Sequence, residues 1–414
     1  MTTANPDDLA GRRNASVASW YRAARHALDR PLTAYYLLLG ASGLLLTIGL
    51  IMVLSASSVY SYERNGSSYA VVSRQLMWVA IALPCAWLAS RLRPSFVRRF
   101  AWLGLLVSVV LLALVRVPGL GREVNGNTNW LGLGPVVVQP AEVAKLAIVL
   151  WAAHIYARKD KRLGSIHEVL MPVVPGVLLV IGLVVLGRDL GTALVLAGIL
   201  LAMLWVVGAP GRIFAAMFSG IAVIALYLAS TSPERLQRLS NFADPFKDFL
   251  NAGWQPAHGL YALSSGGIFG EGIGSSRQKW GDLPEAHTDF IFAVLGEELG
   301  LIGTLLVVAL FLTIAWAATR VASSTTDPFV RYLSFGIVVW LVGQMIINVS
   351  MVLALGPVIG IPLPLLSYGG SALVPSLVAL GLLIGFARRE PEAALALAQR
   401  KKARSARLAA GRVS

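Results

Sequence analysis

The sequence predicts an all-α polytopic membrane protein with about ten transmembrane helices. Of its 414 residues, 56% are hydrophobic and only 14% are charged, and its mean hydropathy is +0.70. Apolar runs recur at the length of about 20 residues with which a helix crosses a bilayer. A segment inside lipid must also satisfy its own backbone hydrogen bonds, which a helix does and an open sheet does not.

We expect ten spans along the chain, at residues 33–56, 75–90, 100–116, 138–157, 170–187, 190–208, 213–230, 289–318, 332–354 and 371–387. They form one membrane domain, residues 33–388, between a basic N-terminal tail at 1–32 and a basic C-terminal tail at 389–414. Ten crossings place both tails on the same side of the membrane.

The distribution of positive charge predicts that both tails are cytoplasmic. In this orientation the inner segments carry 24 of the 35 Lys and Arg residues and the outer loops carry ten, as the positive-inside rule requires. The net charge of +14 therefore indicates topology and contact with anionic lipid, and we expect no nucleic-acid partner. The first 30 residues have no apolar core before a small-residue site, so we expect no cleaved signal peptide. The single Cys85 leaves no intrachain disulfide.

Two outer connections are long, residues 117–138 and residues 231–288. Loops of more than about 15 residues are usually functional or disordered. The second loop, between the seventh and eighth spans, contains Trp254 and Tyr261 and little low-complexity sequence, so we expect it to be ordered. Its part SSGGIFGEGIGSS, residues 264–276, lacks the GK[ST] ending of a nucleotide-binding loop. We expect those glycines to allow tight turns or close backbone contact, and we expect the chemistry on the outer face.

The start of the fourth span carries an ion pair or a ligand site. Gln139 is followed by Pro140, which suits the first position of a helix. Glu142 and Lys145 are three residues apart and share one face, about one turn into the membrane. Two interpretations stay open, a self-neutralising pair and a cationic site for a phosphate.

The segment GRDLGTALV, residues 187–195, predicts a tight outer hairpin between the fifth and sixth spans. Asp189 is a suitable N-cap for the sixth helix. Its neighbour Arg188 either pairs with it or reaches an anionic ligand.

The stretch LPEAHTDFIFAVLGEELG, residues 283–300, carries five ionisable groups into the eighth span: Glu285, His287, Asp289, Glu297 and Glu298. Thr288 or Asp289 would cap the helix, but a cap explains only one carboxylate. A charge near mid-bilayer costs about 2.5–3.5 kcal/mol, so Glu297 and Glu298 should face protein, pair or be protonated, as a structural lock. Asp289 lies at the mouth, where partial burial and neighbouring acids would raise its pKa towards that of a useful base.

The segment GPVIGIPLPLLSYGGSALV, residues 356–374, precedes and enters the tenth span. Its prolines and glycines exclude a regular helix through 356–370, and non-helical backbone at membrane depth is tolerated where it lines a cavity or is covered by protein. Ser367 and Tyr368 offer hydroxyls there. A plain structural turn is the alternative.

These motifs together resemble one known family. PEAHTDFIFAVLGEELG, IPLPLLSYGG, QPAEVAKLA and DLGTALV, spread over ten spans, are similar to the SEDS proteins (shape, elongation, division and sporulation). The resemblance covers about residues 33–388. The cell-division members are the most similar, and the rod-elongation members are the close alternative.

The resemblance implies a peptidoglycan glycosyltransferase that polymerises lipid II at the outer face of the bacterial cytoplasmic membrane, at the division septum. The implied partners are a class B penicillin-binding protein and other division membrane proteins. The family's essential acid falls on Asp289, which we expect to be the general base. We expect the substrate to be bound by Lys145, Glu285, Glu142, Arg188, His287, Ser367 and Tyr368. We see no resident metal-ligand set, although a divalent cation (Mg²⁺ or Mn²⁺) would help to neutralise the diphosphate.

Two departures from the family pattern affect the expected cations. The family commonly has Arg before the Trp of the 124–130 motif, where this chain has Asn129, and Pro before DLGT, where this chain has Arg188. We expect Arg188 to substitute for the missing cation. The opposing functions are a lipid II flippase, whose ionisable groups would lie at the midplane of a repeated fold, and a non-catalytic scaffold that tolerates change of Asp289.

Overall fold

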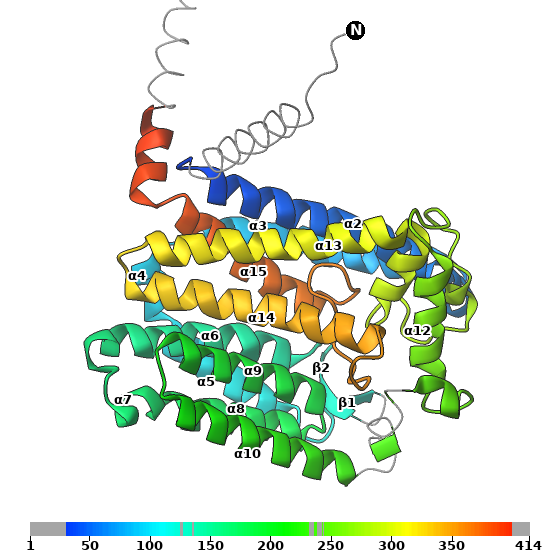
Figure 1. Cartoon of the computed structure of the whole chain (residues 1–414), viewed down its shortest axis with the longest axis horizontal. Coiled ribbons are helices and arrows are strands. Elements are labelled where there is room, and N and C mark those ends of the chain that lie inside the picture. Colours follow the sequence, from blue (N-terminus) through cyan, green and yellow to red (C-terminus); the bar gives the residue numbers. More distant parts are fainter. Residues whose placement is uncertain are drawn as a thin grey trace, which may run out of the picture.

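A computed structural model describes residues 30–124, 127–134, 136–231, 236–237, 242 and 244–399. Within this part of the chain, ten apolar helices of 14 or more residues run side by side (Figure 1). They are α2 (Thr33–Asn65), α3 (Ala70–Arg91), α5 (Ala101–Leu114), α6 (Pro140–Lys159), α8 (Val173–Leu186), α9 (Leu190–Val206), α10 (Gly211–Ser230), α13 (Ile291–Ser324), α14 (Pro328–Val352) and α15 (Gly370–Ala387).

Each of these helices coincides with one of the ten expected spans. By length and composition alone, seven helical segments of the described chain are apolar enough to cross a membrane, and α5 and α9 are shorter apolar helices. The remaining helix, α6, carries Glu142 and Lys145 in its first half. The polytopic all-α fold is therefore confirmed, whereas the number of crossings and the side of each end stay predictions.

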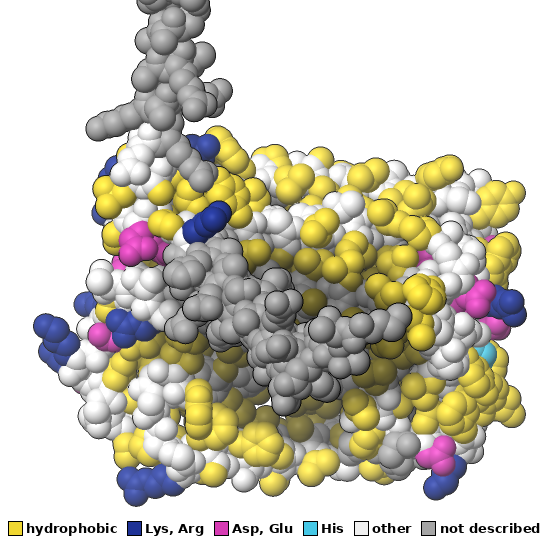
Figure 2. Space-filling model, turned by 45° about the horizontal axis from the view of Figure 1, so that its top comes forward, with side chains coloured by type: hydrophobic (Ala, Val, Ile, Leu, Met, Phe, Trp, Pro, Cys, Tyr) yellow, Lys and Arg dark blue, Asp and Glu magenta, His cyan; other side chains and the backbone are white. Residues whose placement is uncertain are grey.

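The two ends of the bundle differ in what covers them. At one end α12 (Trp254–Ser265) lies across the bundle, and strands β1 (Gly121–Val124) and β2 (Asn127–Leu133) lie towards the same end. At the other end lie the short helices α4 (Pro94–Arg99) and α7 (Ile166–Leu170) (Figure 1). Charged side chains gather towards the ends, with an apolar belt between them (Figure 2). We call the end with α12 the outer end, in keeping with the predicted orientation.

The core lies between the central helices. α13 packs against α2 and α14, α6 packs against α5 and α14, and α15 packs against α3. Large apolar side chains with less than 2% exposure fill the contacts, among them Trp151, Tyr156, Phe311, Phe329 and Trp340. α10 packs against α9 at the edge, and only Ala229 of this helix is buried.

The long connection expected at 117–138 forms a small antiparallel sheet, which was not predicted from the sequence. Strands β1 (Gly121–Val124), β2 (Asn127–Leu133) and β3 (Val136–Val138) pair in the order β1-β2-β3. The β-branched run of β3 and the hairpin dipeptide Asn125-Gly126 in the sequence both favour strands. The sheet leads directly into α6.

The long segment before α13 is ordered over its described part, as expected. It contains two 3₁₀ turns (Pro245–Asp248 and Gln278–Trp280) and α12, while 232–235, 238–241 and 243 lie outside the described residues. Its glycines approach α13 closely: a Cβ on Gly270 would lie 2.2 Å from the carbonyl oxygen of Glu298. Their predicted role in close backbone contact is confirmed.

α13 itself is broken at Gly300, which has φ 66° and ψ −165°. The amides that follow the break donate to the glycine-rich segment, from Leu301 to Gly267 O (2.9 Å) and from Ile302 to Ile268 O (3.2 Å). Backbone groups freed inside an apolar bundle are thus paired again.

Candidate active site

The non-helical segment between α14 and α15, residues 353–369, is fixed by amide side chains from two helices. From α14, Gln344 Nε2 donates to Pro362 O (2.8 Å) and Asn348 Nδ2 donates to Ile361 O (2.7 Å). From α3, Gln75 Oε1 accepts the amide of Gly369 (3.1 Å). The segment is covered by protein, as its predicted departure from helix requires.

The same segment is bonded to the stretch that precedes α13. Ser367 Oγ donates to Thr288 O (2.6 Å), and the Tyr368 amide donates to His287 O (3.0 Å). Asn348 Nδ2 donates to the backbone oxygen of Asp289 (2.8 Å). Ser367 and Tyr368 therefore meet the predicted catalytic stretch, and they position its backbone.

Asp289 is held by its backbone, while its carboxylate receives no hydrogen bond from any described residue. A Cβ on Gly360 would lie 3.4 Å from Asp289 Oδ2, so this glycine leaves space beside the acid. The side chain is partly exposed. Burial, together with the negative charges of Glu285 and Asp189, raises the pKa of Asp289 to about 7.

The predicted capping of α13 by Thr288 or Asp289 is wrong. The N-cap position is Phe290, and no side chain bonds the first turn. Thr288 Oγ1 instead donates to the Glu285 carboxylate (2.5 Å). Asp289 is consequently free of a structural task at its carboxylate.

Glu285 and His287 both precede Asp289 and have different surroundings. Glu285 is exposed and has a left-handed backbone with φ 56°. The ring of His287 lies between those of Tyr60 (4.9 Å between centroids) and Tyr368 (5.7 Å). Burial lowers the pKa of His287, against the opposing effect of Glu285, so this imidazole is neutral at pH 7.

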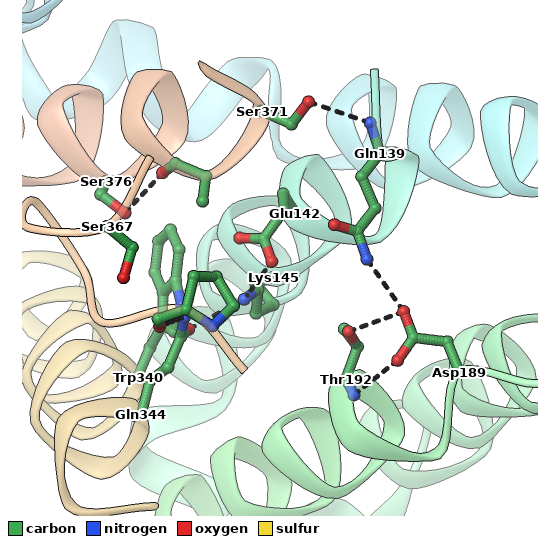
Figure 3. Close-up of polar contacts among 12 residues, drawn as sticks. Gln139, Glu142, Lys145, Asp189, Thr192, Trp340, Gln344, Ser367, Ser371 and Ser376 are labelled. Atoms are coloured by element: carbon green, nitrogen blue, oxygen red, sulfur yellow. Dashed lines mark hydrogen bonds and ion pairs between the residues drawn. The ribbon is translucent and has the colours of Figure 1, made fainter. Parts of the chain in front are cut away.

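Asp189, at the start of α9, is saturated with donors (Figure 3). Its carboxylate accepts hydrogen bonds from Asn129 Nδ2, Gln139 Nε2 and both the amide and the hydroxyl of Thr192, each at 2.9 Å. The predicted N-cap is confirmed. Asn129, which stands where the family commonly has Arg, thus binds the Asp189 carboxylate. The neighbouring Arg188 is exposed and has φ 64°.

Lys145 and Glu142 form the predicted pair on one face of α6. Lys145 Nζ lies 2.8 Å from Glu142 Oε1 and 2.8 Å from Gln344 Oε1, and each residue is 1% exposed. The ammonium lies 5.8 Å from the centroid of the Trp340 ring (Figure 3). The observed arrangement is the self-neutralising pair, and through Gln344 it supports Pro362 in the non-helical segment.

The predicted lock by Glu297 and Glu298 is confirmed. Glu297 accepts the hydroxyl of Ser276 (2.5 Å) and the amide of Arg277 (2.8 Å). Glu298 accepts the hydroxyl of Ser55 (2.5 Å) and pairs with Lys279 (3.2 Å). These acids tie the loop before Asp289 to α13 and α2.

Comparison with known proteins identifies the family. The model of the FtsW, RodA and SpoVE cell cycle proteins matches residues 36–391. The chain belongs to this family. A probable peptidoglycan glycosyltransferase FtsW of Mycobacterium tuberculosis is 39% identical over 370 residues, 89% of this chain and 71% of that protein. The stage V sporulation protein E of Bacillus subtilis is 37% identical over 347 residues, 83% of this chain and 94% of that protein.

Solved structures of family members have the same fold. One chain of a peptidoglycan synthase complex that coordinates polymerization and crosslinking superposes with a TM-score of 0.67 at 28% identity, covering 86% of this chain and 97% of that one. The rod shape determining protein RodA of Thermus thermophilus superposes with a TM-score of 0.61 at 28% identity, covering 86% and 96%.

The described residues of this FtsW/RodA/SpoVE family member do not fit a resident metal ion. No three His, Cys, Asp or Glu side chains among them are grouped as a metal site needs. The divalent cation at the diphosphate stays a prediction.

Sequence reasoning missed the amides that build the family member's site. Gln75, Gln344 and Asn348 are almost fully buried, at 1%, 2% and 0% exposure. Gln344 lies inside an apolar span, Asn348 lies near the end of the same span and Gln75 lies at the start of another, and burying such an amide is costly unless it is bonded. This free-energy cost of burial is the signal from which their hydrogen-bonding role could have been predicted.

Proposed function

We propose that this protein is a peptidoglycan glycosyltransferase of the FtsW type, which polymerises lipid II at the outer face of the cytoplasmic membrane during cell division. Membership of the family and relatives named peptidoglycan glycosyltransferase support the reaction class. The observation that carries the proposal is the Asp289 carboxylate, held at the outer end without a hydrogen-bond donor and with a pKa near 7.

Asp289 acts as the general base. It takes the proton of the 4-hydroxyl of an acceptor GlcNAc while that oxygen forms a bond to the anomeric carbon of the donor MurNAc. The bond from this carbon to the diphosphate breaks, so the linkage inverts from α to β-1,4 and undecaprenyl pyrophosphate leaves. A base works best when its pKa lies near the working pH, and such assistance is worth roughly 10²–10⁴-fold.

The surrounding residues hold the base and tune it. Glu285 and Asp189 keep its pKa raised through their negative charge. Ser367 and Tyr368 fix the backbone just before Asp289 through Thr288 O and His287 O, and Asn348 fixes the backbone oxygen of Asp289 itself.

A cation at the outer end stabilises the leaving diphosphate. Arg188 is exposed and directly precedes Asp189, which is near enough to Asp289 for its negative charge to raise the pKa of that acid. We therefore assign Arg188 to the stabilisation of the leaving diphosphate. Lys145, buried and paired with Glu142, does not contact the diphosphate in this proposal and instead supports the non-helical segment through Gln344. Unchanged polymerisation by an Arg188→Ala variant would remove the role of Arg188.

The partner in this proposal is a class B penicillin-binding protein, which supplies the transpeptidase, and the place is the division septum with other division membrane proteins. A similar chain belongs to a peptidoglycan synthase complex for polymerization and crosslinking, which supports a synthase partner. Division is favoured over rod elongation by the FtsW names of the curated relatives.

The deciding experiment compares lipid II polymerisation by the wild type and by an Asp289→Asn variant, each purified with its partner transpeptidase. Asn keeps the size of the side chain and removes the base, and we expect at least a 10²-fold loss of glycan product with folding and partner binding retained. Full activity in the variant would transfer the role of base to Glu285. Lipid II crossing liposomes without polymer from either protein would favour the flippase.

A further inference from the structure

An apolar groove opens at the inner end of the bundle, away from the site described above. It lies between α2, α3 and α15 and encloses about 290 Å³, and its lining includes Leu39, Gly43, Trp87 and Leu380. One water needs only about 10–15 Å³ of such space, so the groove has room for a much larger apolar group. Leu39 and Trp87 are 49% and 60% exposed.

The groove has the length of one membrane leaflet. Its α2 wall runs from Tyr35 to Leu46, which is about 16 Å at 1.5 Å per residue. Half of a hydrocarbon core of about 30 Å is similar in length. An acyl chain that enters at the inner surface would therefore lie along the whole groove.

Positive charge gathers at the inner mouth of the groove. Arg91 ends α3 and Arg388 follows α15, and both line the groove. Among the described residues neither has a carboxylate within ion-pair distance. Arg389 donates to the backbone oxygen of Arg91 (2.5 Å), and burial, with the charges of Arg388 and Arg93, lowers the pKa of Arg389.

Glu390, the acid nearest to Arg388 in the sequence, instead accepts a hydrogen bond from the hydroxyl of Ser324 at the end of α13 (2.9 Å). Residues 1–32 and 400–414 are both net basic in sequence, so they lack charge complementarity to the mouth. Basic pockets between helices at the cytoplasmic surface suit anionic lipid headgroups. The guanidinium of Arg91 lies 4.9 Å from the centroid of the Trp87 ring, which orients the charge over the groove.

We propose that this groove is a binding site for an anionic phospholipid of the inner leaflet, with an acyl chain between α2, α3 and α15 and the phosphate at Arg91 and Arg388. The site is separate from the proposed transferase chemistry. The non-helical segment 353–369, which contacts the backbone around Asp289, leads directly into α15. A lipid bound against α15 would therefore stabilise the helix that follows this part of the proposed active site.

Two pairs of variants test the charge and the groove separately. Arg91→Gln with Arg388→Gln removes the charge, and Arg99→Gln, an exposed arginine of α4, is its control. Gly43→Trp fills the groove, because a Cβ at Gly43 meets nothing within 4 Å, and Gly40→Trp, with equally open space on α2 outside the groove, is its control.

Delipidated full-length protein is titrated with dioleoyl-phosphatidylglycerol or with zwitterionic dioleoyl-phosphatidylcholine, and retained lipid is counted by native mass spectrometry. We expect the wild type and both controls to retain phosphatidylglycerol selectively. The double arginine variant should bind it roughly thirtyfold more weakly, and Gly43→Trp should lose it with an unchanged melting temperature without lipid.

Equal retention of both lipids by the wild type overturns the proposal. So does binding that survives loss of both arginines, which would indicate an apolar tail alone. A concentration-dependent dimer that Gly43→Trp abolishes would instead assign the groove to a second copy of the chain. If Gly43→Trp does not fold, the arginine pair and its control still decide.

Discussion

Asp189 and Asp289 both lie where an apolar helix begins, and their surroundings differ. Asp189 caps α9 and accepts four hydrogen bonds, at 2.9 Å each. Asp289 precedes α13 without capping it, and only its backbone oxygen is bonded, by Asn348. One acid is 8% exposed and enclosed by donors, whereas the other is partly exposed and lies against the backbone of Gly360.

The difference shows that the number of hydrogen-bond donors around a carboxylate at a helix start, and not the residue type, decides whether it has a structural role. The four hydrogen bonds to Asp189 occupy both of its carboxylate oxygens, three of them at Oδ2 and one at Oδ1, and so tie this side chain to its surroundings. Asp289 is partly buried and gains no donor, so burial and the negative charges of Glu285 and Asp189 raise its pKa to about 7. The first acid has a structural task, and the second is the one to which our proposal assigns the chemistry.

A third carboxylate, Glu298, gives the largest expected effect on stability. In a Lys279→Met variant, Glu298 would remain at 1% exposure without its cation. Breaking a buried pair by removing one partner costs about 3–5 kcal/mol of unfolding free energy. Thermal unfolding in detergent measures it, with Lys161→Met at an exposed site as control. Equal melting of the two variants would contradict the lock.

Asp189→Asn should lower the unfolding free energy by about 1–3 kcal/mol, because an amide placed against the donors Asn129 and Gln139 leaves buried groups unpaired. Asp289→Asn is the matched variant with no such bonds to lose. The pKa of Asp289 in the folded protein lies above its ordinary value of 3.8. The free energy of unfolding of the wild type therefore falls as the pH rises from about 4 to about 7, and the Asn variant lacks this decline.

Melting temperatures of the two Asn variants at pH 5 and pH 8 check this pair. The Asp289→Asn protein should be at least as stable as the wild type at pH 8. If it melts well below the wild type while Asp189→Asn does not, the roles assigned to the two acids are reversed.

The smallest expected effect is a shift of the pH profile. Polymerisation should rise with pH through an apparent pKa near 7, as Asp289 loses its proton. Glu285→Gln removes a negative charge that raises this pKa, so the rising limb should move to lower pH, by less than about one unit because burial is the larger cause. Glu271→Gln, at an exposed position in the preceding loop, should leave the profile unchanged. A shift to higher pH would contradict the assignment.

The helices were predictable and the small sheet was not. An apolar run of about 20 residues has few alternatives to a membrane helix, so the ten ranges follow from composition. Strands of three to seven residues at 121–138 leave a weak pattern, and even the dipeptide Asn125-Gly126 predicts only a local turn.

The partners of the site residues were beyond sequence reasoning. Lys145 permitted either an ion pair or a phosphate contact, and its second partner, Gln344, is 199 residues away in the chain. Asp189 and Asp289 have equal capping propensity, yet only the first meets its helix amide and the side chains of Asn129 and Gln139. Local preference does not contain such distant contacts.

The segment behind Asp289 is held by Gln75, Gln344, Asn348 and Ser367, none of which titrates in water. Uncharged amides and hydroxyls keep their hydrogen bonds across the range of acidity and salt in which carboxylates and histidines change state. A change in the pH of the medium can therefore alter the rate of the proposed reaction without breaking the hydrogen bonds that hold this segment behind Asp289. Acid inhibition should reverse at once when the medium is neutralised, because nothing in this segment has to refold.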